Sequence, residues 1–375
     1  MDIFLVGGAV RDKLMGIPIK DNDYLVVGST PEEMIKLGYK PIGKNFPVFL
    51  HPTTKEEYAL ARTERKVGKG YHGFEFCASP DVTLEEDLKR RDITINAIAM
   101  DDDGNLYDPF NGIEDIKNNC IRHVSDAFSE DPLRVLRVAR FKAKYKTFKV
   151  DSSTKKLLAQ IVKNDEIESL SAERISTEIL KGLVEEDPIG MLDTLDECGA
   201  LERIIPSVKY REHCNNFRAL FENKKIKELS PEHLLVLLIL ISNFSGEQLD
   251  PSIKSFVKQL KVSGRLNKLV SLILDNLNDL LNFLDLENQT QLDCCYHFDF
   301  FRRPQLIFES IMMIEILYDS YQMNFEDVVN TKKLLKQFDM ALDGLKINGN
   351  LPIKGSDIKK IVYQNRLELI KKLVS

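Results

Sequence analysis

The sequence lacks the features of a secreted, zinc-binding or membrane-spanning protein. Its six cysteines show no zinc-type pair spacing, and the only close pair, Cys294 and Cys295, is adjacent. We therefore expect reduced thiols. No basic leader precedes the first apolar residues, and the longest apolar run, 234–241, is far shorter than the roughly 20 residues that span a bilayer. We expect a cytoplasmic protein without a membrane segment.

An excess of positive charge is also missing, because 52 Lys and Arg face 58 Asp and Glu, giving a net charge of -6. RNA binding, if present, must come from local basic faces within an acidic whole. A hydrophobic content of 43% with 29% charged residues is typical of a globular protein, and 375 residues predict two or three domains. No internal repeat or low-complexity segment is present.

Hydrophobic periodicity predicts an α+β head followed by an all-helical remainder. In the head we expect strands at 3–6, from about Asp21 to Val27, 48–50, 58–62 and 73–76, and helices at 9–15 and 84–100. From about Asp131 we expect only helices, at 133–146, 155–163, 172–185, 189–198, 232–241, 251–260, 266–284, 306–321, 325–338 and 356–372.

The first candidate site combines a glycine turn with two aspartates. Gly7-Gly8 follows the first strand and precedes a helix that carries Arg11, so backbone N–H groups and a guanidinium can face a phosphate. Asp21 and Asp23 stand two residues apart, a spacing that puts both carboxylates on one face of a strand. Two such carboxylates suit Mg²⁺, which prefers oxygen ligands. Alone, each pattern is also consistent with a structural turn or a solvated acidic turn.

Three ordered motifs resemble those of the bacterial class II tRNA CCA-adding enzymes, within the DNA polymerase β superfamily. The family pattern GG-x-V-R-D with a following D-x-D matches residues 7–12 and 21–23, R-R-D-x-T-x-N-A matches 90–97, and E-D-x-x-R matches 130–134. Segment 43–52 resembles the CCA-adding branch rather than the bacterial poly(A) polymerases, which have more basic residues there. Segment 354–358 resembles part of the family's tail domain.

The resemblance implies a nucleotidyltransferase head at 1–122, a helical neck with the nucleotide-base template at 123–206, and a helical body and tail at 207–375 that bind tRNA. Longer relatives carry a phosphohydrolase domain with His-Asp metal ligands. This sequence contains no His-Asp pair, and His233 in the corresponding region is followed by apolar residues. We therefore expect no phosphatase or phosphodiesterase activity.

The resemblance also implies the reaction: a tRNA 3′-hydroxyl attacks the α-phosphate of CTP or ATP, and pyrophosphate leaves. Asp21 and Asp23 would hold Mg²⁺, and Glu57 is our candidate for a third carboxylate, with an edge-strand surface charge as the alternative. The nucleotide-binding set is expected to be Gly8, Arg11, Arg91, Asp92, Asn96, Asp131, Arg134, Arg137 and Arg140. Asp92 and Asn96 would lie near the ribose; the alternative for Asp92 is a cap or a salt bridge to Arg90.

Base choice must come from protein side chains. Asp131 and Arg134 are at i and i+3, so they share one side of a helix. A carboxylate accepts from the exocyclic amine of cytosine or adenine, which uracil lacks and which guanine replaces with O6 at that position. Arg134, Arg137 and Arg140 are expected to form a basic stripe opposite a buried face made by Val135, Leu136, Ala139 and Ala143.

Basic residues outside the motifs predict contacts with RNA. Residues 62–73, which include Arg65, Lys66 and Lys69 among glycines, resemble the flexible loop that the family uses to switch from C to A addition. Lys142 and Lys144 extend the positive surface into the neck. The expected function is complete CCA addition and repair on tRNA from CTP and ATP, with no obligate protein partner. CC-only or A-only addition, poly(A) synthesis and non-catalytic tRNA binding remain alternatives.

Overall fold

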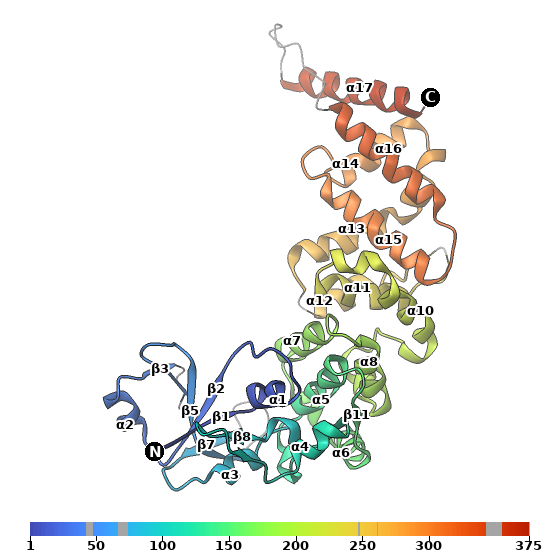
Figure 1. Ribbon diagram of the computed structural model, residues 1–375. Helices are drawn as coiled ribbons and strands as arrows, with labels where there is room; N and C mark the ends of the chain where they lie inside the picture. The colour runs from blue at the N-terminus through green and yellow to red at the C-terminus, as the bar shows by residue number, and fades with distance from the viewer. Residues whose placement is uncertain (43–47, 67–73, 247, 261, 343–354, 375) are drawn as a thin grey trace. The chain divides into compact units, whose positions relative to one another are not determined.

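The computed structural model describes residues 1–42, 48–66, 74–246, 248–260, 262–342 and 355–374. The chain forms two compact units, 1–206 and 207–375. In the described part, the first unit contains the sheets and the helices that follow them, and the second is helical (Figure 1). The α+β head with helical regions behind it is therefore confirmed.

A mixed sheet forms the base of the first unit. Among the described residues it has seven strands in the order β3-β4-β5-β2-β1-β8-β9. Their bounds are β3 (Lys40–Ile42), β4 (Val48–Leu50), β5 (Glu57–Leu60), β2 (Asp23–Val27), β1 (Asp2–Val6), β8 (Ala99–Met100) and β9 (Leu106–Tyr107). β2 and β5 are parallel, and the other pairs are antiparallel. Residues before β2 and β5 therefore enter the sheet from the same end.

Apolar clusters cover both faces of the sheet. Because strand side chains alternate, neighbouring residues belong to different clusters. Leu25 belongs to one apolar cluster, which also contains Phe4 and Leu88, whereas its neighbour Val26 belongs to a second cluster with Met34. Met34 lies on α2 (Pro31–Lys36), and Leu88 lies on α3 (Leu84–Lys89). Short helices thus cover the two faces of the sheet whose strand ends carry the candidate site.

The expected helix at 84–100 is wrong. α3 ends at Lys89, a 3₁₀ turn covers Thr94–Asn96, and β8 follows. Three consecutive residues between them, Ile93, Thr94 and Ile95, are β-branched and at most 2% exposed. Ile93 makes an antiparallel bridge with His123, and Asp92 accepts a hydrogen bond from the Ile93 N–H. Their side chains pack better in extended and 3₁₀ conformations than in a continued helix.

Other boundaries also differ from expectation. The second strand begins at Asp23, so Asp21 precedes it, and the run at 58–62 splits into β5 and β6 (Arg62–Lys66), which pairs with β7 (Phe74–Ala78). A strand also occurs in the region expected to be only helical: β11 (Lys149–Val150) pairs in parallel with β10 (Cys120–Ile121). α10 (Tyr210–Glu222) and α14 (Asn288–His297) are helices that were not predicted from the sequence.

The helices of the first unit centre on α5 (Leu133–Lys144). It packs against α7 (Ala172–Gly182) and α8 (Pro188–Glu197), and α6 (Ser152–Lys163) and α9 (Ala200–Ile204) complete this part. The expected buried face of α5 is confirmed, since Val135, Leu136, Ala139 and Ala143 are at most 1% exposed. Its arginines therefore lie on the other side.

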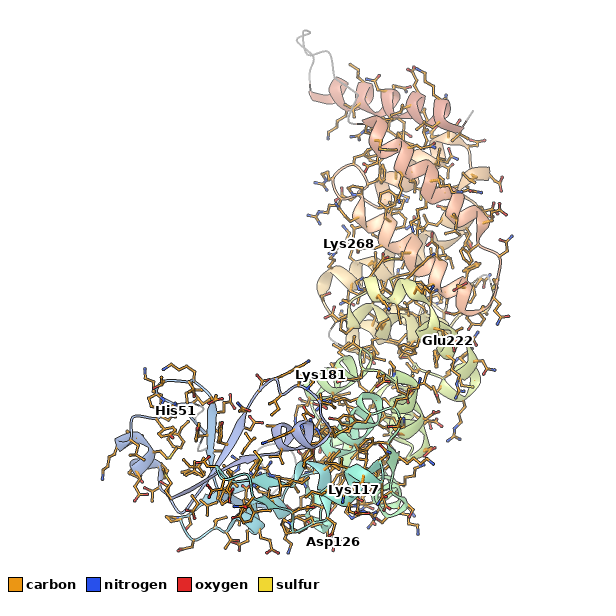
Figure 2. All side chains as sticks on the ribbon, viewed as in Figure 1. His51, Lys117, Asp126, Lys181, Glu222 and Lys268 are labelled. Carbon is orange, nitrogen blue, oxygen red and sulfur yellow. The ribbon has the colours of Figure 1, made fainter. Side chains whose placement is uncertain are left out.

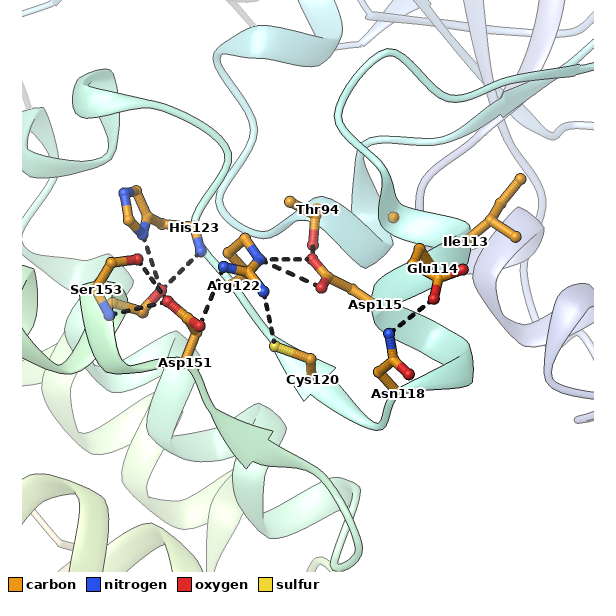
Figure 3. A network of polar contacts seen from close by, with 12 residues as sticks. Thr94, Ile113, Glu114, Asp115, Asn118, Cys120, Arg122, His123, Asp151 and Ser153 are labelled. Carbon is orange, nitrogen blue, oxygen red and sulfur yellow. Dashed lines mark hydrogen bonds and ion pairs between the residues drawn. The ribbon is translucent and has the colours of Figure 1, made fainter.

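A buried polar network joins the 3₁₀ turn to the helical part (Figure 3). Asp115, on α4 (Gly112–Lys117), accepts from the Thr94 hydroxyl at 2.6 Å and from Arg122 at 3.1 Å. Arg122 also pairs with Asp151, the cap of α6, at 3.0 Å. The network anchors the segment that follows the Arg90-Arg91-Asp92 motif.

The second unit is built on an apolar helix. α11 (Pro231–Ser242) is buried from Leu234 to Ser242 and is surrounded by α10, α12 (Ile253–Gln259), α13 (Gly264–Leu281) and α15 (Gln305–Ser320). α14, α16 (Glu326–Leu342) and α17 (Gly355–Val374) complete the unit. Charged residues such as Glu222 and Lys268 are exposed on it (Figure 2). Within the described ranges, no helix is both long and apolar enough to cross a bilayer.

Candidate active site

One cleft of about 670 Å³ in the first unit brings most of the predicted site residues together. It is lined by the ends of β1, β2 and β5, the start of α1 (Gly8–Leu14), the segment 90–96, α5 and α7. The predicted residues among its walls are Gly8, Arg11, Asp23, Glu57, Arg91, Asp92, Asn96, Asp131, Arg134, Arg137, Arg140 and Lys144.

Two carboxylates enter the cleft from neighbouring parallel strands. Asp23 is the first residue of β2, and its register partner is Glu57, the first residue of β5. β5 lies between β4 and β2, so Glu57 is not on an edge strand, and its side chain is exposed at the cleft. Asn22 donates to Glu56 at 2.8 Å, which ties the two strand starts together. The parallel pairing thus places two acidic side chains side by side.

Asp21 takes a different position from the one expected. It lies before the strand and outside the cleft lining, although both Asp21 and Asp23 are exposed. Burial raises the pKa of Asp23, and the Asp21 charge raises it further, while Arg91 opposes both. Among the described residues, no three His, Cys, Asp or Glu side chains gather closely enough to form a metal site by themselves.

The glycine turn is shaped to admit Arg91. Gly7 has φ +68°, and a Cβ built on it would lie 2.9 Å from Arg91 Nη1. Arg91 donates to the Asn96 carbonyl at 3.3 Å and pairs with Asp87 at 3.2 Å. Its Nε is buried and has no hydrogen-bond partner among the described residues. A side chain at Gly7 would therefore displace a cation from the wall of the cleft.

Arg11 is more enclosed than the sequence suggested. Its side chain donates to Asp12 at 2.8 Å and to the Asn96 side-chain oxygen, and it lies over the rings of Phe141 and Tyr145. The residue is 5% exposed. Arg11 thus connects the glycine turn to the 3₁₀ turn and to α5, at the wall of the cleft.

Asp92 is held by Arg137 in a forked ion pair. Asp92 Oδ2 accepts from Arg137 Nε at 2.8 Å and from Nη2 at 2.6 Å, while Oδ1 accepts from Asn96 at 3.1 Å. Burial alone would raise the pKa of Asp92, but Arg137 and these hydrogen bonds lower it to about 2. Arg90, the alternative partner offered by the sequence, pairs with Asp87 at 2.7 Å.

Asp131 and Arg134 both line the cleft, and each is held by other groups. Arg134 donates to the carbonyls of Ala127 at 3.1 Å and Arg90 at 2.6 Å. Asp131 accepts from Arg174, on α7, at 3.2 Å. The two proposed base-reading groups are therefore fixed by separate contacts.

The remaining cations differ in their surroundings. Arg140 pairs with Glu178 at 2.7 Å and still lines the cleft. Lys142 pairs with Asp187 at 2.6 Å and is outside the lining. Lys144 lies in the cleft, 4.0 Å from Asp12, and burial together with Arg11 lowers its pKa.

Part of the predicted RNA-binding set lies beyond what the structure describes. Arg65 and Lys66 belong to β6, but their side chains are outside the described residues. The same holds for Lys69 with its neighbouring glycines, for 43–47 of the segment resembling the CCA-adding branch, and for Lys354. Their roles stay predictions.

Two charged residues that hold side chains of the cleft, Asp87 and Arg174, were not predicted from the sequence. Asp87 is fully buried and pairs with Arg90 and Arg91. Burial alone would raise the pKa of Asp87, but the two arginines lower it. Its spacing of i to i+3 and i+4 before the two arginines was a readable signal. Arg174 carried no such signal, because it stands 43 residues from Asp131 in a segment with no motif that we used.

Comparisons with known proteins point to one family. A family model described as the poly A polymerase head domain matches residues 3–122, and one described as a probable RNA and SrmB-binding site of polymerase A matches residues 147–211. A CCA-adding enzyme from Coxiella burnetii is 39% identical over 375 residues, with 100% of this chain and 96% of that protein covered.

Two further relatives extend the comparison. A multifunctional CCA protein from Chromobacterium violaceum is 60% identical over 208 residues, which are 56% of this chain and 51% of that protein, so the chain spans about half of that relative's length. The crystal structure of the Bacillus stearothermophilus CCA-adding enzyme in complex with CTP matches with a TM-score of 0.67 at 23% identity, covering 100% of this chain and 88% of that one. At that identity the likeness shows the fold.

Proposed function

The chain belongs to the family of bacterial CCA-adding enzymes, and from this premise we propose that it adds and repairs the 3′-terminal CCA of tRNA. It would transfer CMP, CMP and AMP in sequence from CTP and ATP, without a nucleic-acid template, and release pyrophosphate. The observation that carries the proposal is the single cleft that joins paired carboxylates, a glycine turn with cations, and Asp131 with Arg134.

Nucleotidyl transfer in this family implies a divalent metal ion, and we propose Mg²⁺. Asp23 and Glu57 enter the cleft together, and Asp21 stands two residues before Asp23. These oxygen donors fit Mg²⁺, which is commonly bound by one or two carboxylates together with substrate phosphates. When bound, it would lower the cost of activating the attacking hydroxyl and of releasing pyrophosphate.

The cations of the cleft would bind the triphosphate. Gly8 permits close approach at the turn, and Arg91 lines the cleft beside it, so its guanidinium would contribute positive charge next to a phosphate. Arg11 and Arg140 would add positive charge along the same wall.

Asp92 and Asn96 are proposed to lie near the ribose. The Arg137 fork holds the Asp92 carboxylate in one orientation, and Asn96 bridges Asp92 and Arg11. A ribose 2′-hydroxyl that donates to Asp92 would compete with the hydrogen bonds that Asp92 already accepts from Arg137 and Asn96. Selection of ribonucleotides would then depend on the whole cluster rather than on Asp92 alone.

A tRNA extension assay tests the function. The protein is incubated with Mg²⁺ and tRNA that ends at the discriminator base, with CTP alone, ATP alone, or both. Growth by two nucleotides with CTP and by one more when ATP is added supports the proposal. Long A tails would instead identify a poly(A) polymerase, a stop after CC would identify partial addition, and no extension would leave only RNA binding.

A further inference from the structure

Arg174 contacts the residue that would read the base. It is the third residue of α7, and its Nη2 lies 3.2 Å from Asp131 Oδ2 and 3.5 Å from Oδ1. Both side chains are about a quarter exposed, and both residues line the cleft. The contact therefore lies at the rim of the proposed base site rather than inside the protein core.

A second contact fixes the same carboxylate from the start of α5, the helix that follows Asp131. The Leu133 N–H at the start of α5 donates to Asp131 Oδ1 at 3.1 Å. A carboxylate offers about four acceptor positions, and these contacts occupy three at most. At least one acceptor position on Asp131 therefore remains for a ligand, and its direction is set by Arg174 and Leu133.

Arg134 has contacts of its own. Its Nη1 and Nη2 donate to the carbonyls of Ala127 and Arg90, and its guanidinium lies 5.8 Å from the centre of the Phe128 ring. Loss of Arg174 would consequently disturb the acceptor, Asp131, while leaving these contacts of the donor, Arg134, in place.

We propose that Arg174 is a positioning residue that holds Asp131 as a fixed acceptor for the exocyclic amine of cytosine or adenine, and thereby sets discrimination against uracil and guanine. The proposal rests on the proposed function. A carboxylate can accept from an amine but cannot donate to uracil O4 or guanine O6, so a correctly aimed Asp131 favours the two permitted bases.

An arginine suits this task better than a lysine. Its guanidinium is planar and rigid, so Nη2 keeps a fixed direction toward the two Asp131 oxygens, whereas an ammonium acts as a point charge on a flexible stem. Arg174→Lys should therefore restore only part of the selectivity that Arg174→Met loses. This graded rescue distinguishes positioning from simple charge balance.

The test compares three triphosphates on the full-length protein, with tRNA that ends at the discriminator base. They are CTP, UTP and the pyrimidin-2-one ribonucleoside triphosphate, which lacks the exocyclic amine. We expect R174M to lower kcat/KM for CTP by about 10- to 100-fold, the value of one good base-reading contact. UTP and the amine-free analogue should change by less than about threefold, because wild type gains nothing from Asp131 with either.

The matched control is R203M. Arg203, in the same unit, pairs with Glu168 at 3.2 Å and with Asp165 on the surface, away from the cleft lining. It should leave all three values unchanged. Thermal unfolding of each variant shows that it is folded, and R174K keeps the test valid if R174M is not.

Two results would overturn the inference. One is an equal loss for CTP, UTP and the analogue in a folded R174M, which would indicate a structural role. The other is unchanged discrimination between CTP and UTP in both R174M and R174K. Failure of the wild-type protein to extend tRNA with CTP would refute the proposed function itself, and the two failures are thus separable.

Discussion

Asp92 shows how burial and ion pairing act against each other at one residue. Its pKa is lowered to about 2 from an ordinary value of 3.8 because Arg137 and two hydrogen bonds outweigh burial. A carboxyl group whose pKa is lower in the folded state than in the unfolded state stabilises the protein at pH values above its unfolded-state pKa. That contribution, about 2 kcal/mol, is lost progressively as the pH falls from about 4 to 2.

Arg137→Met should therefore destabilise the protein in a pH-dependent way. It leaves a buried carboxylate without its ion pair, so we expect the free energy of unfolding to fall by about 2–4 kcal/mol at pH 7. Urea unfolding at pH 7 and pH 3 measures the effect, which should shrink at pH 3. Lys155→Met, which breaks an exposed pair with Glu197, should change little. An equal loss at both pH values would refute the account.

Asp23→Ala should remove catalysis while leaving RNA binding. Asp23 lies in the cleft beside Glu57, and we expect extension of tRNA with CTP to fall by at least about 100-fold. Filter binding should show tRNA affinity within about threefold of wild type. A variant that extends tRNA at the wild-type rate would remove Asp23 from the proposed metal ligands.

At the scale of elements, the start of α4 determines whether the segment after the Arg90-Arg91-Asp92 motif can pack. A Cβ on Gly112 would lie 2.2 Å from the Thr94 carbonyl oxygen and 2.9 Å from Ile98 Cγ1. Thr94 begins the 3₁₀ turn that also carries Asn96. Only glycine lets α4 approach this turn, and the Asp115 contact with Thr94 depends on that approach.

Gly112→Ala should consequently lower the free energy of unfolding by about 2–4 kcal/mol, the cost of overpacking against backbone. Gly264 is the matched control, because it also begins a helix and nothing in the described structure lies within 4 Å of an added Cβ. Gly264→Ala should be neutral or slightly stabilising. Denaturant unfolding of both variants compares them, and equal stabilities would show that the turn can shift.

Secondary structure illustrates what local pattern could predict. The buried face of α5 followed from helical spacing of apolar residues, and it is confirmed. The helix expected at 84–100 was wrong because burial of Ile93 and Ile95 against the rest of the unit overrides helical periodicity. The 3₁₀ turn places Asn96 between Arg11 and Asp92, an arrangement that a continuous helix would not give.

At the scale of the whole molecule, the net charge of -6 hides a local concentration of cations. Arg11, Arg91, Arg134 and Arg140 line one cleft together with Lys144. Charge gathered in this way attracts phosphates locally even in an acidic protein. The average charge therefore does not decide whether the chain binds RNA.

Substitutions at Lys142 and Lys144 should have different effects, one on stability and the other on the salt dependence of tRNA binding. Lys144 lines the cleft, so Lys144→Met should reduce the slope of log affinity against log salt for tRNA by about 1. Lys142 pairs with Asp187, whose other oxygen caps α8 at the Gly190 N–H, so Lys142→Met should reduce thermal stability and leave the slope unchanged. Binding isotherms at several salt concentrations decide between them, and identical slopes for both variants would contradict the assignment.

The sequence by itself determined the family and most of the residues that line the cleft. The motifs at 7–12, 21–23, 90–97 and 130–134 are local, and local chemistry suffices to recognise them. Tertiary structure decided which of these residues meet. Glu57 faces Asp23 only because β5 pairs in parallel with β2, and Arg137 reaches Asp92 across 45 residues. Such contacts depend on long-range packing and burial, which no periodicity within a single segment encodes.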